Sequence, residues 1–193
     1  MTEKEKSALG LLYQPFDGAE LVAERAAARE KLFVFNRLSP SEAEKGREIL
    51  RGLFGKCGKM FTVETPFRCD YGYNIEIGER FFSNYNFIVL DEAKVTFGDD
   101  VLIAPNVGIY TAGHPLDFER RAAALEYAYP VTVGDGVWIG AGVQILPGVS
   151  IGNGTVIGAG SVVIKDIPAG VLAAGNPCSV IRKITAEDVK KYR

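Results

Sequence analysis

Residues 133–168 read VGDGVW IGAGVQ ILPGVS IGNGTV IGAGSV VIKDIP, one pattern repeated every six residues without a break. An aliphatic residue opens each unit: Val133, Ile139, Ile145, Ile151, Ile157 and Val163. A period of six fits neither an α-helix nor plain strand alternation over this length. It predicts a parallel β-helix in which each unit supplies one short strand and one bend, and three units form a triangular coil. A single coil cannot bury its own apolar face, so the coils must stack.

The repeat also extends toward the N-terminus. The units IGERFF, SNYNFI and VLDEAK, starting at Ile77, form one earlier coil. Two extra residues, Val95 and Thr96, then shift the register before FGDDVL, IAPNVG and IYTAGH. The pattern fails in residues 115–127, PLDFERRAAALEY, which predicts a loop extruded from the prism over about 115–128. Excursions of this length inside compact domains are usually functional.

The first part of the chain has a helical composition. Residues 19–35, AELVAERAAAREKLFVF, consist largely of good helix formers. Ser39 then resembles an N-cap, with Pro40 as the first helical residue and Glu42 as its capping-box partner. We expect this second helix to end at the glycines 55 and 58. The predicted organisation is a helical cap (1–58), a parallel β-helix (59–184) and a short C-terminal helix (185–193), and the fold class is mostly β.

Composition narrows the function. The chain has 193 residues, 47% of them hydrophobic, and a formal net charge of −2, which argues against a nucleic-acid partner. No apolar stretch of transmembrane length and no signal-peptide core are present, so we expect no membrane association and a cytoplasmic location. The three cysteines are odd in number and widely spaced, which indicates reduced structural thiols.

The single histidine, His114, lies in the sequence TAGHP, where a coil ends and the extruded loop begins. Histidine is the side chain best suited to move a proton near neutral pH, although a structural histidine in a turn has the same sequence appearance. Polar residues of the first coil could bind a hydroxylated ligand or simply form bends: Asp70, Asn74, Asn84, Asp91 and Glu92.

Other candidates lie in the later coils. Trp138, the only tryptophan, either packs in the core or lines a ligand groove. Lys165, Arg182 and Lys183 form a basic group that suits a phosphorylated cofactor or a solvated face. The small, turn-rich residues 173–177, AAGNP, would let an extended ligand approach the backbone.

Several segments together resemble the maltose and galactoside O-acetyltransferases. They are CDYGYNIEIG (69–78), SNYNFIVLDE (83–92), LIAPNVGIYTAGHPLD (102–117), PVTVGDGVWIGAGVQILPGVSIG (130–152) and VIKDIPAGVLAAGNPCSVIRKI (163–184), with ALGLLYQPFDGAEL near the N-terminus. The resemblance implies a left-handed parallel β-helix and a homotrimer with each active site between two prisms. It also implies transfer of an acetyl group from acetyl-CoA to a sugar hydroxyl, without a metal.

The resemblance also assigns residues. His114 matches the catalytic base. The matches to acceptor-binding residues are Asn84, Asp70, one of Asp91 and Glu92, and, less securely aligned, Asp17. The matches to acetyl-CoA contacts are Ala141 and Ala159 for the pantetheine arm, Ile164 and Lys165 for a Thr-Lys pair, and Arg182 for the phosphates; we add Trp138 as a groove residue. Ser179 stands where the galactoside enzyme has a second basic contact, which is a departure from the pattern.

The mechanism that these matches imply is direct attack. His114 takes the proton of the sugar hydroxyl as the oxygen attacks the thioester. No serine or cysteine motif indicates a covalent acyl-enzyme. Acyl transfer to another acceptor, such as an amino acid, an antibiotic or a nucleotide-linked sugar, stays open, as does a non-catalytic scaffold. A zinc-dependent carbonic anhydrase of the same fold is excluded because it would need several histidines.

Overall fold

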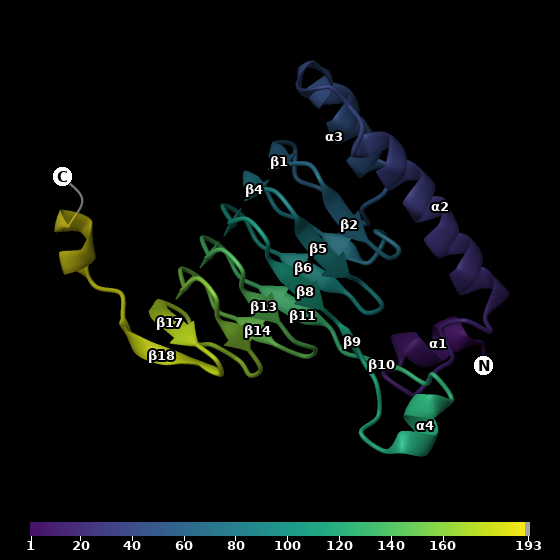
Figure 1. Ribbon diagram of the computed structural model, residues 1–193. Helices are drawn as coiled ribbons and strands as arrows, with labels where there is room; N and C mark the ends of the chain where they lie inside the picture. The colour runs from purple at the N-terminus through teal and green to yellow at the C-terminus, as the bar shows by residue number, and fades with distance from the viewer. Residues whose placement is uncertain (192–193) are drawn as a thin grey trace.

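The computed structural model describes residues 1–191 as a triangular β-solenoid with helices at its N-terminal end (Figure 1). Three sheets form the sides of the prism, and their strands run parallel except for β18, which pairs antiparallel with β17. The seven-stranded face has the order β1 (Phe61–Val63), β4 (Phe81–Ser83), β7 (Leu102–Ile103), β12 (Trp138–Ile139), β15 (Val156–Ile157), β17 (Val171–Gly175) and β18 (Cys178–Lys183). The five-stranded face has the order β16 (Val162–Val163), β13 (Gln144–Ile145), β8 (Gly108–Tyr110), β5 (Phe87–Leu90) and β2 (Phe67–Cys69). The four-stranded face contains β14 (Ser150–Ile151), β11 (Val131–Val133), β6 (Val95–Phe97) and β3 (Ile75–Glu76).

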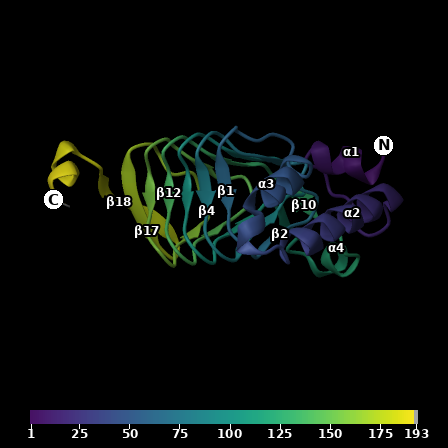
Figure 2. The same ribbon diagram turned by 90° about the horizontal axis from the view of Figure 1, so that it is seen from above.

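Stacking in register explains the repeat. Ser83, Ile103, Ile139 and Ile157 occupy equivalent places in successive coils, and all four are at most 1% exposed. Each inward side chain therefore stacks on its equivalent in the next coil, and each strand pairs with strands of the neighbouring coils. Figure 2 shows the coils stacked along the prism. The predicted fold class is confirmed. The left-handed sense of the coil stays a prediction of the resemblance.

The outer surfaces of the three faces differ in polarity. On the four-stranded face the outward column consists of Glu76, Thr96, Thr132 and Ser150. On the seven-stranded face it contains Phe82, Leu102, Trp138, Val156 and Leu172. Trp138 is 52% exposed, so the core-packing interpretation of this residue was wrong.

The N-terminal helices cover the first coil (Figure 1). Helix α2 (Ala19–Phe35) has the predicted bounds, and the Ser39–Glu42 capping box is present. The helix it opens starts as the 3-10 turn η1 (Pro40–Glu42), continues as α3 (Ala43–Arg51) and ends before the two glycines expected to stop it. Gly55 has another role: a Cβ there would lie 2.2 Å from the Tyr73 carbonyl oxygen, so the residue permits close backbone approach to the first coil.

Two short elements were not predicted. Helix α1 (Glu3–Ala8) is closed by a Thr2–Glu5 capping box, and α4 (Phe118–Ala122) lies in the segment that leaves the stack between β9 (Ala112–Gly113) and β10 (Tyr127–Ala128). The expected terminal helix is the 3-10 helix η2 (Ala186–Lys190), and residues 192–193 of that prediction lie outside the described residues. No helix in the described chain is long and apolar enough to cross a membrane.

Candidate active site

One corner of the prism is longer than the others. We call it the long corner; it joins the five-stranded face to the four-stranded face through residues 70–74, 91–94, 111–130, 146–149 and 164–166. Val89 and Ile145 hold equivalent places, as do Phe97 and Ile151, so the earlier coil has two more residues here than the later one. The predicted two-residue register shift is thereby confirmed, but its assignment to Val95 and Thr96 was wrong: both lie in β6 in register with Val131 and Thr132, so the extra residues belong to the turn 91–94. The third coil is lengthened further by the segment that carries His114.

Asp91 organises the backbone of the long corner. Its carboxylate is fully buried and accepts hydrogen bonds from the backbone N–H groups of Asp70 (3.0 Å), Tyr71 (2.8 Å) and Gly72 (2.7 Å). Burial raises the pKa of Asp91 to about 7, against the three N–H donors that lower it. Both carboxylate oxygens are occupied within the chain, so Asp91 holds one lengthened turn onto the next.

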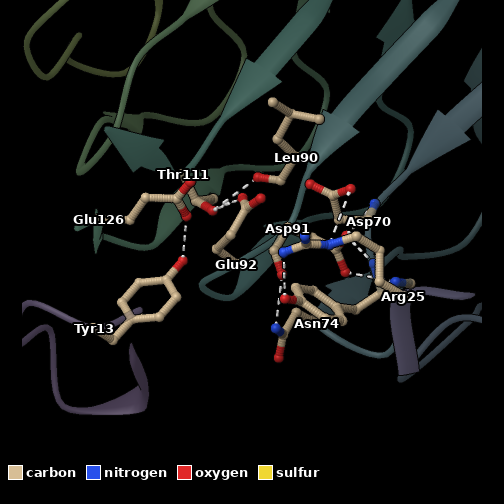
Figure 3. Close-up of polar contacts among 11 residues, drawn as sticks. Tyr13, Arg25, Asp70, Asn74, Leu90, Asp91, Glu92, Thr111 and Glu126 are labelled. Carbon is tan, nitrogen blue, oxygen red and sulfur yellow. Dashed lines mark hydrogen bonds and ion pairs between the residues drawn. The ribbon is translucent and has the colours of Figure 1, made fainter. Parts of the chain in front are cut away.

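Glu92 differs from its neighbour. Its side chain lies with Asp70 and Thr111 in a polar cluster at the long corner (Figure 3). Burial, and next the Asp70 carboxyl, raise the pKa of Glu92 to about 9. Thr111 Oγ1 lies 2.8 Å from the Leu90 carbonyl oxygen and 3.3 Å from Glu92 Oε2. The Leu90 carbonyl also accepts the Thr111 backbone N–H at 3.1 Å, so the threonine hydroxyl can be shared between that carbonyl and the Glu92 carboxyl.

Helix α2 contributes a cation to this cluster. Arg25 Nε lies 3.6 Å from Asp70 Oδ1, and its terminal nitrogen donates to the Tyr71 hydroxyl at 2.7 Å. Desolvation is the largest influence on Arg25, but its anionic and phenolic neighbours raise its pKa, so it stays charged. Asp70 also lines a cavity of about 720 Å³ between α2 and the five-stranded face, together with Arg29, Arg37 and Arg68.

His114 stands beside this cluster in a defined tautomer. Its Nδ1 lies 2.9 Å from the Leu125 carbonyl oxygen. A carbonyl oxygen only accepts, so Nδ1 carries the hydrogen, and in the neutral ring Nε2 keeps its lone pair. The side chain is 46% exposed. The imidazole is thus held with its basic nitrogen accessible, and Leu125 supplies the orienting contact that sequence reasoning could not identify.

The second structural neighbour of His114 is Glu126. Its Oε1 lies 3.8 Å from His114 Nε2. Its Oε2 accepts a hydrogen bond from the Tyr13 hydroxyl at 2.8 Å, which Figure 3 shows. The sequence offered no signal for either residue, because Glu126 lies in an aperiodic charged segment and Tyr13 in a connection of the cap.

A different set of predicted residues lies on the corner between the seven-stranded and five-stranded faces, which we call the short corner. Asn84, Ala141 and Ala159 follow β4, β12 and β15, respectively. The turns stack through backbone bonds: Gly142 N–H donates to the Pro105 carbonyl at 2.9 Å and Gly160 N–H to the Ala141 carbonyl at 2.8 Å. Because the turn side chains are small and Ala141 and Ala159 are exposed, an extended ligand can lie close to this backbone.

The remaining predicted residues are spread along the molecule. Ile164 and Lys165 are exposed on the long corner, below His114 in the stack. Ser179 and Arg182 lie on β18, where Arg182 forms a two-pronged ion pair with Asp188 at 2.8 and 2.6 Å. Asp17 is exposed just before α2. Within residues 1–191 no group of three or more His, Cys, Asp and Glu residues could hold a metal ion.

The five-stranded face separates the two corners of one prism. Asn84 and Asp91 in the same coil lie at opposite ends of β5, whose 4 residues at about 3.3 Å each span roughly 13 Å. A single acceptor hydroxyl therefore cannot contact Asn84 and His114 of the same chain. The predicted residues of the two corners are therefore separate groups on each chain.

Comparison with known proteins identifies the class. Residues 6–58 match the family model described as the maltose acetyltransferase hexapeptide capping motif, and residues 130–165 match the bacterial transferase hexapeptide of six repeats. Together with the solenoid and its histidine-bearing corner, these matches define an acetyltransferase of the hexapeptide-repeat class. The chain belongs to the maltose and galactoside O-acetyltransferase family.

Individual relatives cover nearly the whole chain. A putative acetyltransferase of Saccharomyces cerevisiae is 57% identical over 93% of this chain and 91% of its own length, and the galactoside O-acetyltransferase of Escherichia coli is 45% identical over 89% and 85%. The crystal structure of a maltose O-acetyltransferase from Clostridium difficile 630 superposes with a TM-score of 0.94 at 54% identity, covering 96% of this chain and 98% of the other. A galactoside acetyltransferase in complex with coenzyme A superposes with a TM-score of 0.96 at 42% identity, covering 100% and 96%.

Proposed function

We propose that this protein transfers the acetyl group of acetyl-CoA to a hydroxyl of a sugar such as maltose, glucose or a galactoside. The observation that carries the proposal is the His114 tautomer: the Leu125 carbonyl 2.9 Å from Nδ1 keeps the lone pair on Nε2, beside a polar cluster able to bind hydroxyl groups. A relative of known name that covers most of this chain acts as a galactoside O-acetyltransferase, which supports the same substrate class.

The base works on a poor nucleophile. His114 Nε2 takes the proton of the sugar hydroxyl while the oxygen attacks the thioester carbonyl, and the resulting imidazolium returns the proton to the departing thiolate. General base help of this kind contributes about 100- to 10,000-fold. No covalent acyl-enzyme is needed, because both substrates are held at the same groove.

We assign the acceptor to the long corner. Asp70 and Glu92 belong to the polar cluster. A protonated Glu92 can both donate hydrogen bonds to sugar hydroxyls and accept them. Asp91 has its carboxylate oxygens engaged by backbone N–H groups, so of the adjacent acids Glu92 is the proposed acceptor contact. Asp17, exposed at the start of α2, is a further candidate at the rim.

We assign acetyl-CoA to the short corner and the end of the solenoid. Exposed backbone at Ala141 and Ala159 suits the pantetheine arm, and the exposed Trp138 ring on the adjoining face offers an apolar wall. Lys165, with Ile164 beside it, and Arg182 are the proposed polar and phosphate contacts, while Ser179 leaves one side of the phosphate site without a cation. Two relatives of known structure were solved with coenzyme A or acetyl-CoA bound. The proposed chemistry needs no metal.

Two copies must meet to complete this site. The short corner of one prism, with Asn84, would face the long corner of its neighbour, with His114. The apolar outer column of the seven-stranded face, including Leu102 and Trp138, gives such contacts a surface to bury. Each chain has one corner of each kind, so the contact is heterologous and closes into a ring, for which we propose a homotrimer. We further propose that the enzyme works in the cytoplasm.

The test measures coenzyme A release with acetyl-CoA and a panel of sugars, amino acids and nucleotide-linked sugars. The proposal expects release with simple sugars and a fall of at least about 100-fold in His114→Ala at an unchanged unfolding midpoint. Full activity in the folded His114→Ala variant would contradict the assignment of His114 as the base. If no sugar gave release of coenzyme A, the proposed function would be contradicted.

A further inference from the structure

Glu126 occupies a position that the general-base mechanism does not explain. Its side chain is 14% exposed, and one carboxylate oxygen is taken by Tyr13 while the other points at His114 Nε2 across 3.8 Å. In the resting enzyme both facing atoms are hydrogen-bond acceptors, so no bond joins them. Once Nε2 gains the substrate proton, the same pair becomes an imidazolium facing a carboxylate.

Backbone pairing fixes Glu126 and the residues that follow it. Tyr13 and Glu126 form an isolated antiparallel bridge, with both N–H···O=C bonds at 3.0 Å. The next residues along the chain, β10, pair with β9 directly before His114. Gln14 Nε2 adds a bond of 2.6 Å to the Ala123 carbonyl oxygen. The N-terminal segment is thus joined to the base of the proposed catalytic loop by a one-residue β-bridge and a side-chain bond.

Tyr13 is suited to hold a carboxylate. Its side chain is 1% exposed and packs with Leu21, Tyr71 and Ala128. Burial, followed by the charge of Glu126, raises the pKa of the Tyr13 phenol, so it remains a donor at every pH of interest. The bond directs Glu126 Oε2 away from His114 and leaves Oε1 toward it.

We propose that Glu126 is a positioning and charge-stabilising partner of the His114 imidazolium, fixed in place by Tyr13, and that the N-terminal cap thereby tunes the catalytic base. The proposal rests on the proposed function and adds a residue to it. The Glu126 carboxylate faces the atom that gains the substrate proton, so it stabilises the positive charge that the ring acquires during the reaction.

The effect of Glu126 on His114 has to be distinguished from the effects of other charged groups nearby. The acids Glu92 and Asp70 belong to the adjoining turns, and Arg25 reaches them from α2. Within the loop, Arg121 is bonded to the carbonyl oxygens of Pro115 and Leu116. The comparison below changes Glu126 alone and leaves all of these groups in place.

The first experiment needs no substrate. His114 is the only histidine, so its ring proton resonances report one titration in the whole protein. The proposal expects the midpoint of that transition to move to lower pH in Glu126→Gln, by about 0.5 to 1 pH unit for a half-exposed ring. Glu119→Gln, which removes an exposed charge from α4 in the same loop, is the matched control and leaves the midpoint in place.

The second experiment follows the pH profile of kcat/KM. In Glu126→Gln the plateau falls about 10-fold, because the base is weaker, while the acid limb moves to lower pH; KM for acetyl-CoA stays constant. Tyr13→Phe lowers the plateau and moves the acid limb in the same directions, by smaller amounts. In Glu126→Asp the histidine midpoint lies close to its wild-type value. A merely structural role for Glu126 would lower activity without moving the limb.

The outcomes are distinguishable. An unmoved histidine midpoint in a folded Glu126→Gln protein overturns this inference while leaving acetyl transfer by His114 intact. A wild-type protein that releases no coenzyme A overturns the proposed function, yet the coupling between Glu126 and His114 would still be measured by the titration.

Discussion

The later coils of this solenoid and its long corner differ in how regularly the chain repeats. From Val133 to Val163 every side of the prism has six residues, an inward aliphatic side chain and a tight bend. At the long corner of the earlier coils, extra residues interrupt this pattern, and there the structure buries Asp91 and Glu92 and extends the loop with His114. The stacked strands supply stability and spacing, and the inserted residues carry the side chains that we propose for the chemistry.

The difference has a physical reason. A hexapeptide side leaves room only for a strand and a bend, so its backbone groups pair with the neighbouring coils and its few buried polar side chains, such as Thr155 and Ser161, bond nearby backbone. Additional residues at a corner create unpaired N–H groups that need an acceptor, and Asp91 provides it for three of them. A buried carboxylate is therefore the structural consequence of lengthening the corner, and it lies next to the acids proposed to bind the acceptor.

The largest expected effect comes from removing that acceptor. Asp91→Ala leaves three backbone donors without their partner, and each costs about 1–3 kcal/mol when it stays buried. We expect a large loss in the free energy of unfolding, together with loss of activity, measured by denaturant unfolding and coenzyme A release. Asp91→Asn keeps one oxygen acceptor and should lose much less. Equal stability of Asp91→Ala and the wild type would contradict the role of this residue.

A regular coil should respond in stability alone. Ile151→Ala removes a side chain that is 2% exposed and should cost about 2–5 kcal/mol, because a cavity remains inside the prism. Ser150→Ala, its outward neighbour in β14, should stay within about 0.5 kcal/mol. Below the unfolding transition both variants should keep the wild-type rate per folded molecule. A fall in kcat in Ile151→Ala would contradict the claim that the regular coils contribute to stability and not to the reaction.

The long corner should also make stability depend on pH. The pKa of Glu92 is about 9 in the folded protein against 4.5 for an unperturbed group, so the folded state holds this proton to higher pH. Its stabilising contribution is complete below about 4.5 and is lost as the pH rises through 9. Residue 92 of Glu92→Gln does not titrate. The free energy of unfolding of this variant, relative to the wild type, should therefore rise by up to about 1.4 kcal/mol per pH unit across this window. Parallel curves for the two proteins would contradict the burial effect.

The smallest effect concerns the bends. Gly154 has φ +64° and open space around a hypothetical Cβ, so Gly154→Ala should cost about 1–2 kcal/mol from backbone conformation alone. Gly154→Asn should cost less, because Asn86 and Asn106 adopt φ 59° and 61° at bends of the earlier coils. Thermal unfolding measures both changes. A more stable Gly154→Ala protein would contradict the conformational argument.

The regular region was open to prediction and the long corner only partly so. The six-residue period predicted the solenoid, its inward side chains and the two-residue shift, because one local rule repeats in every coil. The period also located His114 at the point where the pattern stops. The start of the second helix was predictable from Ser39 and Glu42, whereas its end was not, since Gly55 serves a contact with Tyr73 and not a helix terminus.

The contacts between segments could not be predicted from local patterns. Glu126 and Tyr13 are 113 residues apart, and no spacing rule joins a connection in the cap to an aperiodic loop. The exposure of Trp138 was within reach of the pattern, because the repeat points Ile139 inward and strand alternation then turns its neighbour outward. The separation of Asn84 from His114 depends on the three faces of the prism, which only the assembled coils define.

The most direct test of the account is complementation between two defective chains. His114→Ala disables the long corner and Asn84→Ala the short corner, and each variant alone should be nearly inactive. If each site combines one corner from each of two neighbours, mixed assemblies formed at equal amounts by co-expression should regain about a quarter of the wild-type activity, the share of interfaces with both corners intact. A mixture of His114→Ala with Glu92→Ala, both on the long corner, should regain none. Mixed assemblies of the first pair that stay as inactive as their parents would contradict the shared site.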